Sequence, residues 1–392
     1  MDPKYRQIFE PIMSGDHLKK LEAIPNDEVM AFIAEAIELG QPDSVWVGSD
    51  SPEDIACIRQ MAIDNREEIP LKTPGHTVHF DGYFDQARDK AVTKYLVPEG
   101  EQLDEKLNQM PRAEGIAEMN NLQRGAYKGR TMLVRFFCLG PPETVFAIPC
   151  LQITDSAYVA HSEDLLYRGG YEQFVHLKEG AEFFKYRHAT GRVDDRMCSK
   201  DVENKRVYMD YTRKCVMSVN TQYAGNTVGL KKLSLRLAIR KADQEGWLAE
   251  HMFIMRSNGP GGRQTYFCGA FPSACGKTST AMIPGENIVG DDLAYFRVID
   301  GEFRAANVES GIFGIIEDVN PDDDPVIYDV LTKPGEVIFG NVLVKDGKPY
   351  WNGMGQELPK SGTNYTGEWT EGKVGPDGNP TRPSHKNARY TV

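Results

Sequence analysis

The sequence has few basic residues for its length, since 45 lysines and arginines stand against 57 aspartates and glutamates in 392 residues. The resulting net charge is -12, whereas a nucleic-acid-binding domain usually carries a basic surplus. This balance argues against a nucleic-acid partner. An anionic small molecule remains possible, but only where cations gather locally.

Paired cysteines and long apolar segments are also missing. The cysteines number 7, lie far apart and form no Cys-x-x-Cys pair, so neither a disulfide framework nor a cysteine-rich zinc site is supported. No apolar run reaches the roughly 18 residues that a transmembrane helix needs. The N-terminal segment has charges every few positions and lacks the apolar core of a secretory signal. We therefore expect a cytoplasmic protein with no membrane partner.

The N-terminal part of the chain alternates helix and strand signals. Asn26 is a good capping residue for a helix over residues 27–39, and a short β-branched run follows at residues 45–47. Ser51-Pro52 then has the form of a new helix start, with a capping serine before a proline. Residues 64–80 have the composition of a loop. The alternation of strand and helix predicts an α/β protein.

The remaining sequence predicts more sheet around one long helix. From Thr131 the chain is rich in β-branched and aromatic residues, and from Leu230 its apolar residues recur at helical spacing. Residues 265–271 are typical of a buried strand. Asp300-Gly301 and Asp346-Gly347 each lie between two β-type runs, which predicts two hairpins. The length allows two or three domains.

The strongest chemical signal is the segment Ala270–Ser279, which follows a strand and precedes a helix start. Its small residues would let backbone N–H groups surround phosphate oxygens at the N-terminus of the helix. Lys277 would then reach the β- and γ-phosphates, and the Thr278 hydroxyl would bind the Mg²⁺ of a nucleotide. The usual first glycine is replaced by Phe271, so this loop needs a different backbone path.

Three further places in the sequence carry weaker signals for a functional site. Asp292 ends an apolar run shortly after the phosphate loop, a position suited to a carboxylate that holds a divalent metal near the phosphates. Taken alone, His251 would be a structural histidine, and Lys231-Lys232 a solvated basic turn.

Together these segments resemble the GTP-type phosphoenolpyruvate carboxykinases. Four motifs occur in the order of that family, and the octet FPSACGKT is its unusual phosphate loop. They are Tyr223-Ala-Gly-Asn with Lys231-Lys232, Glu245-Gly-Trp-Leu-Ala-Glu-His-Met, Phe271-Pro-Ser-Ala-Cys-Gly-Lys-Thr and Val289-Gly-Asp-Asp. The likeness extends to Asn387-Ala-Arg-Tyr near the end of the sequence.

The resemblance implies a two-lobed α/β fold with the active site in the cleft between the lobes. Residues 1–246 would form a substrate-binding lobe, and residues 247–392 a mixed-sheet, P-loop nucleotide lobe that is incomplete at its C-terminus. It also implies a carboxy-lyase of gluconeogenesis that converts oxaloacetate and GTP into phosphoenolpyruvate, CO₂ and GDP, and back.

The family's site residues are carried over by position. Lys232, His251 and Asp292 match the ligands of a catalytic Mn²⁺, and Thr278 matches the group that contacts the nucleotide's Mg²⁺. The positions that match substrate-binding residues are Arg88, Tyr223, Ala224, Gly225, Ser273, Asn387 and Arg389. The nucleotide-binding positions are Ala274, Cys275, Gly276, Lys277, Thr278 and Ser279. Arg88, Cys275, Lys277 and Arg389 are the positions expected to act in catalysis, with Cys275 positioning the loop and not acting as a nucleophile.

This sequence departs from the family pattern at Ala224, Leu230 and Lys386, where the family has glycine, glycine and proline. The family's base-binding aromatics and mobile lid would lie beyond Val392. Three alternatives therefore stay open: the same reaction with ITP, ATP or pyrophosphate as donor, a different kinase reaction, and a non-catalytic fragment without the lid.

Overall fold

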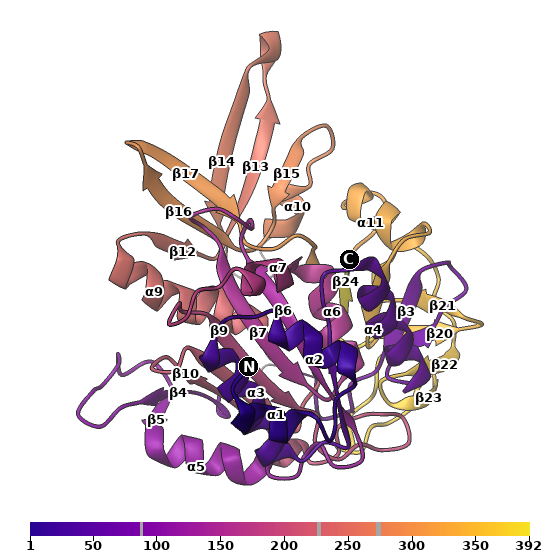
Figure 1. Ribbon diagram of the computed structural model, residues 1–392. Coiled ribbons are helices and arrows are strands. Elements are labelled where there is room, and N and C mark those ends of the chain that lie inside the picture. Colours follow the sequence, from indigo (N-terminus) through magenta and orange to yellow (C-terminus); the bar gives the residue numbers. More distant parts are fainter. Residues whose placement is uncertain (87–88, 226–228, 272–275) are drawn as a thin grey trace.

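The computed structural model describes residues 1–86, 89–225, 229–271 and 276–392 (Figure 1). Its centre is a nine-stranded mixed sheet in the order β1-β6-β7-β9-β11-β10-β4-β5, with β8 beside β6. The strands are β1 (Ser44–Val47), β4 (Thr93–Val97), β5 (Gln109–Pro111), β6 (Thr131–Leu139), β7 (Ile148–Thr154), β8 (Arg168–Gly169), β9 (Phe184–Ala189), β10 (Arg206–Asp210) and β11 (Cys215–Val219). The protein thus has a mixed α/β fold, as predicted.

Helices cover both faces of this sheet, which explains why its central strands are buried along nearly their whole length. One face packs against the N-terminal helices α1 (Pro3–Phe9), α2 (Gly15–Glu22) and α3 (Asp27–Gly40), together with α5 (Arg112–Gln123) and α7 (Tyr171–Val175). The other face packs against α4 (Pro52–Asp64), α6 (Ala157–Leu166) and the helical run that begins at Leu230.

The predicted helix starts and hairpins are present. The Asn26 side chain accepts the N–H of Val29 at 3.3 Å, and the Ser51 hydroxyl accepts the N–H of Asp54 at 3.2 Å. Asp300 begins the turn between β16 (Ala294–Ile299) and β17 (Glu302–Asn307). The second hairpin joins β20 (Leu343–Lys345) to β21 (Lys348–Tyr350).

The expectation of a loop over residues 64–80 is wrong. β2 (Ile69–Pro70) and β3 (His76–His79) lie at the edge of a five-stranded sheet in the order β18-β24-β19-β3-β2. β3 pairs in parallel with β19 (Val337–Gly340), and this sheet also contains β18 (Phe313–Ile315) and β24 (Arg389–Thr391). Because the strand partner lies so far away in sequence, no local signal marks β3 as a strand.

The helix predicted over residues 230–252 is a helical run of three parts that ends earlier, at Glu245, because residues 248–250 form a strand. α8 (Leu230–Lys232) leads into a π-helical segment, η3 (Leu233–Leu237), and then into α9 (Ala238–Glu245). Gly246 ends the run in the left-handed conformation, with a φ of 74°.

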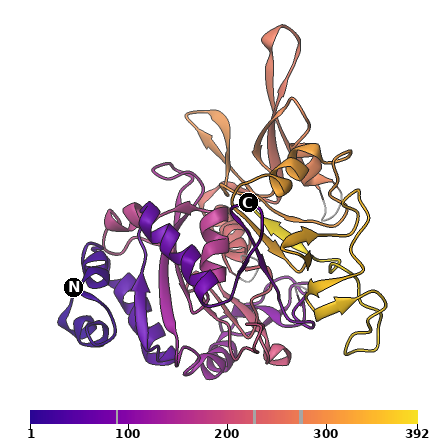
Figure 2. The same cartoon turned by 90° about the vertical axis from the view of Figure 1, so that its right-hand side faces the viewer.

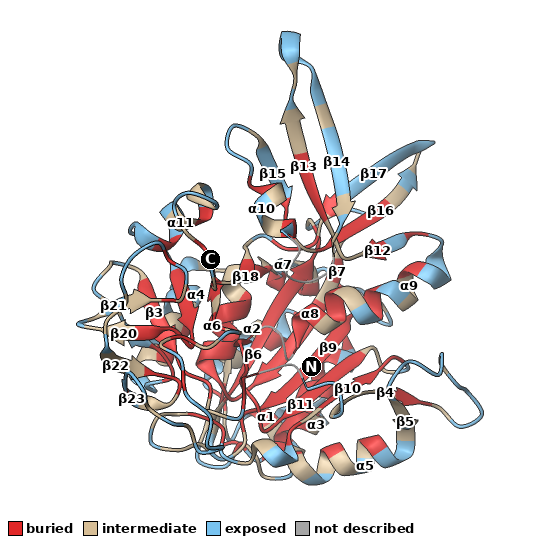
Figure 3. Ribbon diagram, turned by 180° about the vertical axis from the view of Figure 1, so that it is seen from behind, coloured by how far each residue is buried: buried red, intermediate tan, exposed pale blue. Residues whose placement is uncertain are grey.

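Two small sheets project from the body of the molecule. They have the orders β14-β13-β15 and β12-β16-β17, with the remaining strands β12 (Leu248–Glu250), β13 (Met252–Asn258), β14 (Gln264–Ala270) and β15 (Asn287–Gly290). Figure 3 shows that their tips are exposed. Residues 265–271 are therefore not a buried strand as expected, since Tyr266 and Phe267, whose side chains point to opposite faces of β14, are 63% and 50% exposed.

The other elements are short. They are α10 (Lys277–Ala281), α11 (Pro325–Thr332), β22 (Ser361–Asn364), β23 (Gly367–Thr370) and the 3₁₀ turns η1 (Val202–Asn204) and η4 (Pro260–Gly262). In Figure 2 the N-terminal helices and the strands between residues 343 and 370 lie at opposite ends of the molecule. Among the described residues, no helix combines the length and apolar composition that crossing a bilayer requires.

Candidate active site

The described end of the phosphate loop is Gly276, which precedes the first residue of α10. Its φ of 80° is left-handed, a conformation that glycine adopts without steric cost. Ser273, Ala274 and Cys275 lie outside the described residues. The helix start places Lys277 and Thr278 beside the turn that follows β15, and that turn carries two consecutive aspartates.

The second of these aspartates, Asp292, is the electrostatic centre of the site. Its Oδ1 lies 2.8 Å from His251 Nε2 and 2.5 Å from Lys277 Nζ, and its Oδ2 lies 2.6 Å from Lys231 Nζ. Burial opposes ionisation of the carboxyl, but Lys231, His251 and Lys277 together hold the pKa of Asp292 well below its usual range. The carboxylate is therefore charged and surrounded by nitrogen groups.

Sequence reasoning missed two participants in this cluster, Lys231 and Glu309. Lys231 Nζ is also 2.6 Å from Glu309 Oε1, and both side chains are buried. Burial favours a neutral amine, yet the charges of Asp292 and Glu309 raise the pKa of Lys231 above its ordinary value. Lys231 is therefore a counter-ion in this structure. The paired lysines marked the right place in the sequence, whereas no motif marked Glu309.

Lys232, the lysine that was expected as a metal ligand, is half-buried next to Lys231. Its backbone N–H donates to the carbonyl oxygen of Gly229 at 2.8 Å, which starts the helical run. The ligand role expected for Lys232 stays a prediction.

The first aspartate, Asp291, faces the phosphate loop. The Thr278 hydroxyl donates to Asp291 Oδ2 at 3.0 Å. Burial and the neighbouring charge of Asp292 raise the pKa of Asp291 to about 6. The next loop residue, Ser279, donates to Asp324 Oδ1 at 2.5 Å from its hydroxyl. Carboxylate and hydroxyl oxygens therefore converge where the phosphates of a nucleotide and their cation would lie.

A second group of predicted residues comes together around Arg389. Arg389, at the start of β24, has its Nε 3.4 Å from the hydroxyl of Tyr223 and its guanidinium 5.4 Å from the centre of the Phe313 ring. The Tyr223 hydroxyl donates to the carbonyl oxygen of Asn387 at 3.4 Å. A cation, a phenol and an amide thus lie close together, which suits a small carboxylate ligand.

The turn after Tyr223 has a left-handed backbone, which explains why the family pattern has glycines at these positions. Ala224 and Gly225 have φ values of 53° and 55°, both in the left-handed region. A Cβ at Gly225 would lie 2.7 Å from the Ser162 side chain. Arg88 lies outside the described residues, but Gln86 shortly before it accepts the Asn387 side-chain N–H at 2.9 Å.

The cluster around Asp292 and the group around Arg389 line one open cleft with a volume of about 770 Å³. Most of the predicted site residues that the structure describes are among its walls, together with Lys231, Arg236 and Phe313, which were not predicted. The predicted residues in its lining are Tyr223, His251, Gly276, Lys277, Thr278, Ser279, Asp292, Asn387 and Arg389.

The cleft offers mixed ligands for a cation. Within the described part of the chain, no group of three or more His, Cys, Asp and Glu side chains could hold a metal ion. His251 Nε2 and Asp292 Oδ1 nevertheless converge as an imidazole nitrogen and a carboxylate oxygen, which are common ligands of divalent transition metals. A third ligand would have to come from a group outside these residue types, such as a lysine amine.

Comparison with known proteins gives the same family along nearly the whole chain. The model of the phosphoenolpyruvate carboxykinase N-terminal domain matches residues 31–243, and that of the phosphoenolpyruvate carboxykinase C-terminal P-loop domain matches residues 247–392. The phosphoenolpyruvate carboxykinase (GTP) of Thermococcus kodakarensis is 55% identical over 384 residues, which are 98% of this chain and 62% of the relative.

Two other relatives with the same name agree. That of Pyrococcus abyssi is 56% identical over 377 residues, which are 96% of this chain and 61% of the relative. That of Saccharolobus solfataricus is 45% identical over 381 residues, which are 96% of this chain and 59% of the relative. The chain thus spans about three fifths of the length of the curated relatives it matches.

Proposed function

Since the chain belongs to the GTP-type phosphoenolpyruvate carboxykinase family, we propose that the protein catalyses the reversible conversion of oxaloacetate and GTP into phosphoenolpyruvate, CO₂ and GDP. The observation that carries this proposal is the single cleft in which Asp292, His251 and Lys277 lie next to Arg389 and Tyr223. A phosphate-binding group and a carboxylate-binding group are thereby within reach of one another. We place the protein in the cytoplasm.

Enzymes of this family generally use divalent metal ions, and the cleft contains imidazole, carboxylate and hydroxyl groups, which are common ligands of such ions. We propose that His251, Asp292 and Lys232 hold a catalytic Mn²⁺, with the lysine bound as the neutral amine. Thr278 would contact the Mg²⁺ of the nucleotide, with Asp291 behind the threonine. The catalytic cation would supply Lewis-acid stabilisation of the oxyanion that develops when oxaloacetate loses CO₂.

The protein's own residues would do the positioning. Arg389 and Asn387 would orient the carboxylate groups of oxaloacetate or phosphoenolpyruvate with Tyr223, and the guanidinium would also offset the charge that develops on the enolate oxygen. The turn residues Ala224 and Gly225 would present their backbone to the same ligand. We assign Arg88 and Ser273 to this group by their place in the family motifs.

Phosphoryl transfer would take place at the other end of the cleft. The enolate oxygen attacks the γ-phosphorus in line, and the bond to the β–γ bridging oxygen breaks, so that GDP leaves with the electron pair. Lys277 would offset the charge on the β- and γ-phosphates. We assign Ala274, Cys275, Gly276 and Ser279 to the loop that holds the phosphates, with Cys275 positioning the loop.

We further propose that the chain divides into a substrate-binding lobe, residues 1–246, and a nucleotide lobe, residues 247–392. Limited proteolysis that yields two stable fragments with a boundary near Gly246 would support this division. A stable fragment that spans the boundary, with cleavage only elsewhere, would contradict it.

The experiment that tests the function is a product assay. Oxaloacetate, GTP and Mn²⁺ are incubated with the protein, and phosphoenolpyruvate and pyruvate are measured together, with His251→Ala as the site variant. The exposed histidine His176 provides a matched control in His176→Ala. We expect metal-dependent product from the parent and the control but not from the site variant. Equal rates in all three proteins, or no metal-dependent product from any of them, would contradict the proposal.

A further inference from the structure

A buried aspartate, Asp81, lies behind the turn that carries Tyr223 and Gly225. Its side chain is almost fully buried, and its Oδ2 accepts the backbone N–H of Ala224 at 3.3 Å. Ala224 has a φ of 53°, a left-handed conformation that residues with a Cβ rarely adopt. A contact that holds the Ala224 peptide therefore contributes directly to the shape of this turn.

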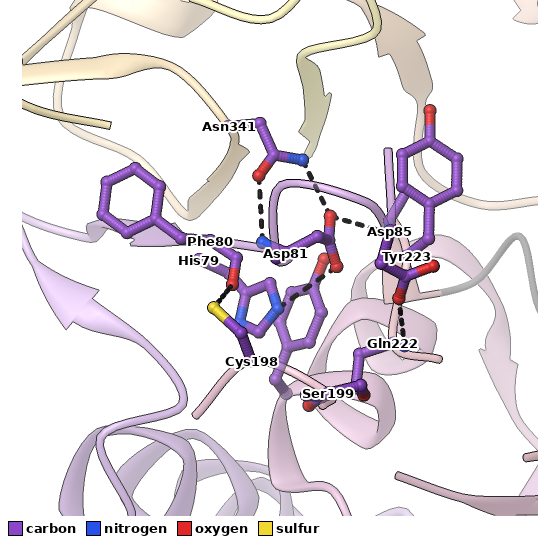
Figure 4. A network of polar contacts seen from close by, with 12 residues as sticks. His79, Phe80, Asp81, Asp85, Cys198, Ser199, Gln222, Tyr223 and Asn341 are labelled. Atoms are coloured by element: carbon purple, nitrogen blue, oxygen red, sulfur yellow. Dashed lines mark hydrogen bonds and ion pairs between the residues drawn. The ribbon is translucent and has the colours of Figure 1, made fainter. Parts of the chain in front are cut away.

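Asp81 is itself held from two sides, as Figure 4 shows. The Asn341 side chain accepts the backbone N–H of Asp81 at 2.9 Å and donates to its Oδ2 at 2.7 Å. His79 Nε2 lies 3.4 Å from the other carboxylate oxygen. His79 ends β3, and Asn341 directly follows β19, so the ends of two paired strands fix the carboxylate in place.

The neighbour on the other side of the carboxylate, His79, is oriented by the backbone. His79 Nδ1 lies 2.6 Å from the carbonyl oxygen of Glu67, which only accepts hydrogen bonds, so Nδ1 carries a proton. Nε2 faces Asp81 Oδ1 at 3.4 Å. Burial disfavours the imidazolium, but Asp81 raises the pKa of His79. Both side chains are buried, so solvent does not compete for the contact between Asp81 and the Ala224 N–H.

A second carboxylate of the same loop holds the start of the turn. Asp85 accepts the backbone N–H of Gln222 at 3.0 Å and the Thr221 hydroxyl at 2.8 Å, and it lies 3.2 Å from Lys205 Nζ. The loop that contains Asp81 and Asp85 therefore contacts the turn at two separate peptide groups. Removing the Asp81 carboxylate would leave the turn attached at Gln222 through Asp85 but would free the Ala224 peptide.

We propose that Asp81 is a positioning residue for substrate binding, which acts by holding the Ala224 peptide so that the Tyr223 hydroxyl stays beside Arg389. Asp81 is not among the residues that line the cleft. The nature of the ligand, phosphoenolpyruvate with Mn²⁺, rests on the proposed function. Without the carboxylate, Ala224 would relax out of the left-handed region and the Tyr223 hydroxyl would move away from the guanidinium.

The test compares three variants of the full chain with the parent by calorimetric titration with phosphoenolpyruvate in the presence of Mn²⁺. Asp81→Ala removes the acceptor, and we expect it to weaken binding about tenfold to hundredfold, the range for a lost hydrogen bond to a charged group. Asp81→Asn keeps an oxygen for the Ala224 N–H, and its amide can donate to a neutral His79, so it should restore affinity to within about threefold of the parent.

The matched control is Asp210→Ala. Asp210 is fully buried and holds the turn at Thr212 and Arg213 through their backbone N–H groups, away from the cleft. We expect the affinity of this variant to stay close to that of the parent. Equal weakening in Asp81→Ala and Asp210→Ala, or no rescue by Asp81→Asn, would overturn the proposal, because either result would mean that Asp81 supports only the fold.

A second measurement, hydrogen exchange, needs no ligand, and its first comparison uses the parent protein alone. The Ala224 amide of the parent should be protected from hydrogen exchange, and Asp81→Ala should accelerate its exchange at least about tenfold while Asp81→Asn does not. Exchange of the parent amide at the rate of an unstructured peptide would overturn the positioning role. Failure of the parent to bind phosphoenolpyruvate, with normal protection of Ala224, would instead count against the proposed function alone.

Discussion

His161 offers a direct test of how strongly a buried ion pair stabilises this fold. It lies on α6, with Nδ1 2.8 Å from Glu68 Oε1 and Nε2 3.2 Å from Glu336 Oε1. Burial favours the neutral ring, but the charges of Glu68 and Glu336 raise the pKa of His161 to about 10. Both ring nitrogens therefore donate to carboxylates, and the imidazolium joins α6 to the segment before β19.

The size of the effect follows from the pKa. A rise from about 6.5 to about 10 corresponds to about 5 kcal/mol, at about 1.4 kcal/mol for each pKa unit. Glu336 is 37% exposed, so solvent screens its share, and most of the stabilisation comes from buried Glu68. Removing one partner of a buried pair typically costs about 3–5 kcal/mol. We therefore expect His161→Gln to lower the free energy of unfolding by about 3–5 kcal/mol at pH 7.

The pH dependence gives a second check. Because the folded-state pKa of His161 is raised, its stabilisation is fully present below about pH 6.5 and is lost as the pH rises through about 10. Urea denaturation of the parent, of His161→Gln and of the exposed-histidine control His176→Gln, at several pH values between these limits, measures both effects. A loss below about 1 kcal/mol at pH 7, or the same pH dependence in His161→Gln as in the parent, would refute this reasoning.

Three further predictions concern the cleft. His251→Ala or Asp292→Ala should weaken Mn²⁺ binding at least about tenfold, because each removes a proposed ligand. Electron paramagnetic resonance titration measures this, and an unchanged Mn²⁺ affinity would mean that the ligands are misassigned. Lys277→Met should weaken GTP binding in calorimetry and abolish phosphoryl transfer. Lys333→Met, at an exposed lysine, should change neither. Equal GTP affinity in the two variants would contradict a phosphate-binding role for Lys277. Removing the metal with EDTA should abolish product formation in the product assay, because no cation would then stabilise the developing oxyanion, and equal yields with and without EDTA would contradict a catalytic metal.

Local signals in the sequence were sufficient for much of the fold. The caps at Asn26 and Ser51 and the hairpin turns at Asp300 and Asp346 appear in the structure because the side chains or backbone of a few adjacent residues decide them. β3 was missed because its identity as a strand depends on β19, a partner that no local pattern reveals.

The site residues divide in the same way, into those that a local sequence pattern reveals and those that it does not. The phosphate loop and the run that ends at Asp292 were recognisable because their chemistry needs particular residues at fixed spacing. Glu309 was not, because its role is to be buried against Lys231, and burial of a single acid after a strand leaves no pattern in the sequence. Asp81 was missed for a related reason, since its partners Asn341 and Ala224 come from separate parts of the chain.

The pairing of β3 with β19 also has a consequence for the order of events on the ribosome. Asp81 lies two residues after β3 and Asn341 directly follows β19, and the two residues are 260 positions apart in the chain. At a synthesis rate of about 5–20 residues per second, β3 emerges roughly 10–50 s before its partner is made. During this time an edge with free N–H and C=O groups is available to other chains. We expect chaperones that bind extended segments to protect residues 69–79 of the nascent protein.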